Sequence, residues 1–155
     1  MDDRRHRLLM LAAGQLAVVV GMLHLGLGVR YWSLYAMAGS ILPPDIRVPL
    51  WTISGTVLLV GVVVVVRQGL HRRRLAYWLG AALMMTYILG YFSWHLGGHR
   101  AFFIMGNARL HDTGLVTFLI DHAIAGPIET IALVTETLLL VVLGVLLHDD
   151  RDTEP

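Results

Sequence analysis

Long apolar stretches separated by short polar segments dominate the chain. Four of these stretches are about as long as the roughly 20 residues that a helix needs to cross a bilayer. They cover about residues 8–29, 48–66, 75–96 and 127–147. Because lipid offers no partner to backbone groups, each stretch predicts a transmembrane helix, including the β-branched run 62–66 that would suggest a strand in water. The pattern therefore predicts an all-α, polytopic membrane protein built as a four-transmembrane-helix bundle.

The region before the fourth span needs a break. Residues 115–148 are mostly apolar, and one helix of that length would measure about 50 Å, against a hydrocarbon core of ~30 Å. Gly126-Pro127 supplies the break, since proline favours the first turn of a helix. We therefore expect a short interfacial helix on the external side at about 115–125 and a fourth span that starts at Pro127. A charged tail, 149–155, follows it.

Composition excludes the soluble alternatives. Apolar residues make up 56% of the chain and charged residues 15%, whereas a soluble domain carries about 25% charged residues. Intrinsic disorder needs the opposite balance of low hydrophobicity and high charge. The 155 residues are thus expected to form a single membrane domain. The absence of cysteine from the sequence removes thiolate metal sites and cysteine nucleophiles.

Arginine positions orient the spans. Eight of the twelve basic residues lie before the first span, between the second and third, or in the tail: Arg4, Arg5, Arg7, Arg67, Arg72, Arg73, Arg74 and Arg151. The positive-inside rule then predicts a multi-pass protein of the cell membrane with cytoplasmic N- and C-termini. A net charge of +1 gives no reason to expect nucleic acid. The bilayer is the expected partner, and other membrane subunits or a second copy of the chain stay open.

Histidines gather on the predicted outer half. His24 and His95 lie near the outer ends of the first and third spans, and a b-type haem would use two such imidazoles from different helices. A copper, zinc or iron site would instead draw three or four ligands from the same region. The candidate ligands are His24, His95, His99, His122 and Glu129. Whether the cofactor is haem or a transition metal stays open, and each histidine could also simply bond a carbonyl or a lipid headgroup.

Helical spacing supports an inward position for His24. Ala17, Gly21, His24 and Gly28 share one face of the first span, and small residues are what membrane helices place against each other. We therefore expect His24 to point into the bundle and to approach His95.

Glu136 is the most unusual residue of the fourth span. It lies about 13 Å inside Pro127, where an ionised carboxylate costs about 2.5–3.5 kcal/mol. We expect it to face other helices. It is either a proton relay, working with Glu129 and His122, or a structural carboxyl group hydrogen-bonded across helices. For the second case the candidate partners are Gln15, Thr56 and Thr86.

Three functional hypotheses follow. No G-x-S-x-G, H-E-x-x-H or P-loop motif occurs in the sequence, so hydrolase and nucleotide chemistry lack support, no catalytic residue is assigned, and a non-enzymatic role is favoured. The principal hypothesis is a redox-associated membrane subunit or accessory protein whose outer histidines bind haem or a transition metal. The alternative is a proton- or ion-handling protein that uses Glu136, Glu129 and His122. The third is a purely structural or partner-binding subunit.

Overall fold

The computed structural model describes residues 3–68, 73–96, 114–124 and 126–149, and every regular element in them is helical. Four helices are long and apolar enough to cross a membrane: α1 (Asp3–Met37), α2 (Arg47–Gln68), α3 (Arg73–Leu96) and α6 (Pro127–Asp149). A short helix, α5 (Leu115–Ala123), precedes α6. The all-helical class and the four membrane-compatible helices predicted from the sequence are confirmed.

The bounds of α1 differ from the prediction. The apolar pattern ends the first span near Val29, but α1 continues to Met37, because no glycine or proline interrupts residues 30–37. The helix is then closed by Gly39, whose φ of 86° suits glycine, with Ser40 N donating to Tyr35 O at 2.9 Å and Gly39 N to Ala36 O at 3.0 Å. These two bonds form the Schellman type of helix end.

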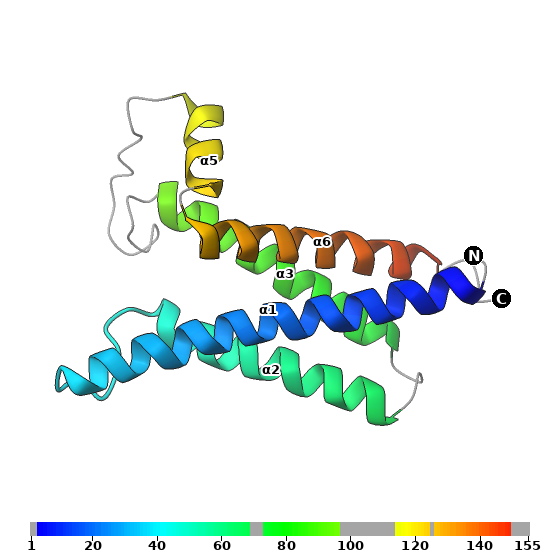
Figure 1. The fold of residues 1–155 in the computed structure, drawn as a ribbon, viewed down its shortest axis with the longest axis horizontal. Coiled ribbons are helices and arrows are strands. Elements are labelled where there is room, and N and C mark those ends of the chain that lie inside the picture. Colours follow the sequence, from blue (N-terminus) through cyan, green and yellow to red (C-terminus); the bar gives the residue numbers. More distant parts are fainter. Residues whose placement is uncertain (1–2, 69–72, 97–113, 125, 150–155) are drawn as a thin grey trace.

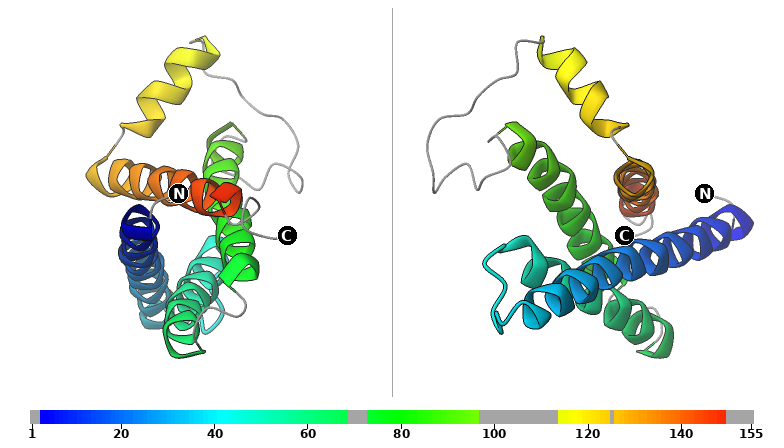
Figure 2. Two further views of the ribbon diagram at one scale, coloured as in Figure 1. Left: turned by 90° about the vertical axis from the view of Figure 1, so that its right-hand side faces the viewer. Right: turned by 60° about the vertical axis from the view of Figure 1, so that its left-hand side comes forward.

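The long helices form two pairs. Helices α1 and α2 pack along each other as one pair and α3 and α6 as the other, and α1 joins the pairs by lying against α6. Helices α2 and α3 touch only slightly. The start of α1 lies beside the end of α6, as Figure 1 and the two further views in Figure 2 show. We call this end of the bundle, which also holds the end of α2 and the start of α3, the arginine-rich end, and the other the Pro127 end.

Glycines allow α1 and α2 to approach closely. A Cβ atom added at Gly55 would lie 2.6 Å from the backbone nitrogen of Leu25, and one at Gly21 would lie 2.8 Å from Cγ of Leu59. One at Gly28 would collide with Thr52. The small-residue face predicted for the first span is therefore a helix interface, as expected of membrane helices.

The apolar core occupies the half of the bundle nearer the arginine-rich end. Helix α6 presents one stripe to it, formed by Glu136, Leu139, Leu143, Leu146 and Leu147. Against this stripe pack buried residues of α1 and α3: Ala13, Ala17, Val20, Tyr77 and Met84. Many other large apolar side chains of the four long helices are exposed, which suits surfaces that face lipid. Helix α5 runs crosswise to α6 (Figure 1) and contacts it only briefly.

Candidate functional site

A histidine and a glutamate meet inside the bundle. Nε2 of His24, on α1, lies 3.3 Å from Oε1 of Glu136, on α6, and the two side chains are only 7% and 5% exposed. Within the described residues, these are the two polar or charged residues that are buried. The prediction that both point into the bundle is confirmed.

Local helix geometry defines the proton positions on His24. Its Nδ1 lies 3.0 Å from the carbonyl oxygen of Val20, one helical turn earlier. A carbonyl oxygen only accepts hydrogen bonds, so Nδ1 must carry a proton and donate it there. In a neutral ring, Nε2 is then a bare acceptor that faces Glu136.

This tautomer places one proton between His24 and Glu136. Either the protonated carboxyl group donates to Nε2, or a cationic imidazole donates from Nε2 to the carboxylate. Both forms are neutral overall, which lowers the cost of burial compared with an isolated charge. The geometry therefore allows a proton to move between two side chains without any change in net charge.

Tyr87 of α3 covers one face of the imidazole. The two rings are stacked, with centroids 3.9 Å apart and planes 5° from parallel. The stack fixes the orientation of the imidazole plane. The Tyr87 hydroxyl is buried and makes no well-aligned hydrogen bond in the described structure. The Ser54 hydroxyl on α2 is its neighbouring hydrogen-bonding group; because Ser54 donates its own proton to Leu50 O, its oxygen is left as an acceptor toward Tyr87.

The surroundings of the pair differ on its two sides. Toward the arginine-rich end lie buried apolar side chains, which include Val20, Met84, Leu139 and Leu143. Toward the Pro127 end lie polar groups of α3 and α6. There His95 Nδ1 lies 2.8 Å from Tyr91 O, the Tyr91 and His95 rings are 4.2 Å apart, and Glu129 lies in the first turn of α6. The site is closed on one side and polar on the other.

Other predicted site residues have separate positions. His95 is half-buried and contacts Tyr91; its approach to His24 stays a prediction. Glu129 is exposed, and its carboxylate covers Gly126, where an acidic group stabilises the start of α6. His99 lies outside the described residues, and so does the side chain of His122. Among the described residues no group of three or more histidine or acidic side chains could hold a metal ion.

The partner of Glu136 was not predicted correctly. Thr56 and Thr86 donate their hydroxyls to carbonyls of their own helices, and Gln15 is exposed. His24 takes the place proposed for them. Because α1 extends past Val29 to Met37, His24 lies deeper than the sequence pattern indicated and comes level with Glu136. Tyr87 was also missed, although its spacing of three from Met84 is a helical signal that it faces the same way.

Comparisons with known proteins identify no relative. No protein-family model, curated protein or solved structure matches the chain.

Proposed function

We propose that the chain is a proton-handling integral membrane protein in which the His24–Glu136 pair holds an exchangeable proton. The observation that carries this proposal is the 3.3 Å contact between two titratable side chains that are almost completely buried between α1 and α6. It takes up the proton-handling alternative with Glu136 as its centre, with His24 as the proton partner of Glu136, and with Glu129 among the polar groups toward the Pro127 end.

The energetics of burial argue against a purely structural pair. Apolar side chains of similar volume would join α1 to α6 at least as well, since removing a buried ion pair in favour of good packing is often neutral or stabilising. Ionisable residues within membrane spans are correspondingly rare and mark functional sites. A histidine and a carboxylate in contact are suited to binding and releasing protons.

The asymmetry around the pair supports exchange toward one side. Tyr91, His95 and Glu129 provide hydroxyl, imidazole and carboxylate groups toward the Pro127 end, whereas apolar side chains separate the pair from the arginine-rich end. The positive-inside rule makes the arginine-rich end cytoplasmic. In this proposal both termini are cytoplasmic, α5 lies at the external interface, and the proton exchanges with the external compartment.

The contacts of His24 give the redox hypothesis less support. Its Nδ1 donates to Val20 and its Nε2 faces Glu136, so coordination of a haem iron or another metal through Nε2 would require the pair to separate. Optical spectra and metal analysis of the purified protein test this hypothesis. A haem absorption band that disappears in His24→Ala and His95→Ala would support haem binding over proton binding.

Infrared difference spectroscopy tests the proton site itself. When the pH of the reconstituted protein is lowered, the carbonyl stretch of a buried protonated carboxyl group, which lies at higher frequency than that of water-exposed carboxyl groups, should appear with wild type and be absent with Glu136→Gln. Glu129→Gln is the matched control because it alters an exposed carboxylate of the same helix, and it should keep the band. A spectrum that is the same for wild type and Glu136→Gln would contradict the proposal.

A further inference from the structure

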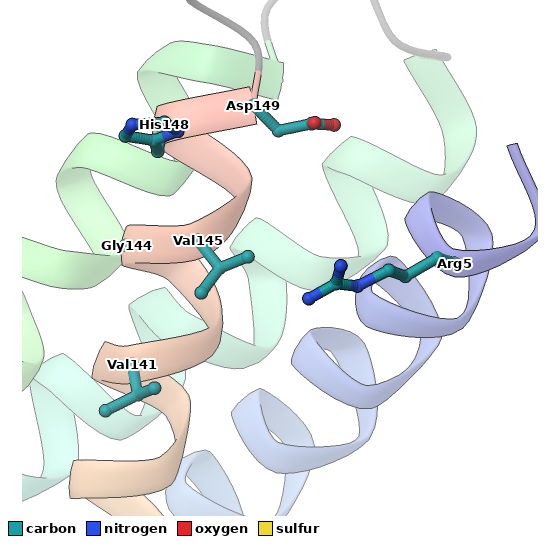
Figure 3. A pocket seen from close by; sticks show the side chains of 6 residues that line it. All are labelled: Arg5, Val141, Gly144, Val145, His148 and Asp149. Atoms are coloured by element: carbon teal, nitrogen blue, oxygen red, sulfur yellow. The ribbon is translucent and has the colours of Figure 1, made fainter. Parts of the chain in front are cut away.

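A groove runs between the start of α1 and the end of α6, on the arginine-rich side of the His24–Glu136 pair. It is lined by Arg5, Val141, Gly144, Val145, His148 and Asp149 and encloses about 520 Å³. In Figure 3 the side chain of Arg5 extends from α1 across the gap toward α6. The groove is therefore built from both helix pairs of the molecule.

The deeper part of the groove is apolar and open. Val141 and Val145 are 58% and 37% exposed, and a Cβ atom added at Gly144 would meet nothing within 4 Å. Glycine here leaves a channel between two valines on the lipid-facing side of α6. An apolar surface left open in this way suits a hydrocarbon chain.

The mouth of the groove carries an uncompensated positive charge. Arg5 forms no hydrogen bond or ion pair in the described part of the chain. The nearby carboxylate of Asp149 is paired with His6, whose Nδ1 lies 3.0 Å from Oδ2. The guanidinium group thus lies above an apolar channel with its donors available for an anion.

We propose that this groove binds an anionic phospholipid. The phosphate would accept hydrogen bonds from the Arg5 guanidinium, and the adjoining acyl chain would lie along Val141, Gly144 and Val145. Arginines and anionic lipids attract each other at the cytoplasmic surface, and guanidinium groups match phosphate oxygens in geometry.

Lipid-dependent stability of the full-length protein tests the proposal. Phosphatidylglycerol should raise the melting temperature of detergent-solubilised wild type more than phosphatidylcholine with the same acyl chains. The apparent affinity for phosphatidylglycerol should fall roughly five- to tenfold in Arg5→Gln and stay near wild type in Arg7→Gln, which removes the same charge from the same helix. Gly144→Leu, which fills the channel toward lipid, should also weaken binding.

Three results would overturn the proposal. Equal losses in Arg5→Gln and Arg7→Gln would show a general charge effect instead of a site. An equal response to phosphatidylcholine would show that the headgroup charge is irrelevant. Stabilisation by glycerol phosphate as large as that by phosphatidylglycerol would show that a soluble anion, and no lipid chain, occupies the groove.

Discussion

Two histidine–carboxylate pairs join the same two helices. His24 and Glu136 meet in the middle of α1 and α6 at 3.3 Å, with side chains 7% and 5% exposed. His6 and Asp149 meet at the arginine-rich end at 3.0 Å, with side chains 16% and 17% exposed. The functional groups are the same, so any difference in role must come from their surroundings.

The surroundings give the two pairs different properties. His6 and Asp149 lie at the helix ends and are more exposed than the inner pair, so their interaction is screened more strongly. His24 and Glu136 lie between apolar core residues and the stacked ring of Tyr87, where an unpaired charge is expensive. The functional groups are the same, so their burial makes the difference. The buried inner pair, His24–Glu136, is suited to holding a proton, and the more exposed outer pair, His6–Asp149, is suited to joining two helix ends.

Removal of one side chain of the His24–Glu136 pair should have the largest effect on stability. We expect Glu136→Ala to lower the free energy of unfolding by about 3–5 kcal/mol, because it leaves His24 buried without its partner. The double variant His24→Ala/Glu136→Ala should be less destabilised than the sum of the single variants. Equilibrium unfolding in mixed micelles measures this, with Glu129→Ala as the control on the same helix. Additive losses would show that the two side chains are not coupled.

A milder change should separate stability from proton binding. Glu136→Gln keeps a donor for Nε2 of His24 and should cost only about 1 kcal/mol, while proton uptake at the site is lost. The same unfolding assay and a proton-uptake measurement on one preparation compare the two effects. A variant that unfolds readily would show that the charge is needed for the fold, and unchanged uptake would place the proton elsewhere.

Disruption of the outer pair should matter less. His6→Ala and Asp149→Asn should each reduce the melting temperature by less than Glu136→Gln does, and the reduction should shrink as salt is added, since exposed ion pairs are screened. Melting curves at low and high ionic strength check this. An outer-pair variant that is as destabilised as Glu136→Ala would remove the distinction between the pairs.

The Asp45–Arg47 ion pair should have the smallest effect on stability. Its contribution should change with pH in a direction that can be stated. Burial alone would raise the pKa of Asp45, but its hydrogen bonds with Arg47 and that residue's charge outweigh it, so the pKa lies below its ordinary value of 3.8. A depressed pKa means stability that is present above the unfolded value and is lost as the pH falls through the folded value. Asp45→Asn keeps the capping bond from the Arg47 backbone and should flatten this acid dependence slightly. Melting temperatures between neutral and strongly acidic pH check it; an unchanged acid slope would contradict it.

The sequence predicts the positions of helices better than the contacts between them. Single residues show the physical reasons. Pro127 marks the start of α6 because its ring suits a first helical turn, and Glu136 is predicted to face inward because lipid offers it no partner. The predicted end of α1 is too early because the apolar stretch stops at Val29, before Arg30, whereas the helix itself continues to Met37. The His24–Glu136 contact joins residues far apart in the chain. It depends on helix depth and rotation, which hydropathy does not encode.

The division into two helix pairs has a consequence for biosynthesis. Chains emerge from the ribosome N-terminus first, so α1 and α2 are made together, and their contact at Gly21, Gly28 and Gly55 can form before the rest of the protein exists. His24 is then already part of the α1–α2 pair, while Glu136 is made only later, with α6. The proposed proton site is thus complete only when α6 has docked against α1, and until then His24 lacks its carboxylate partner.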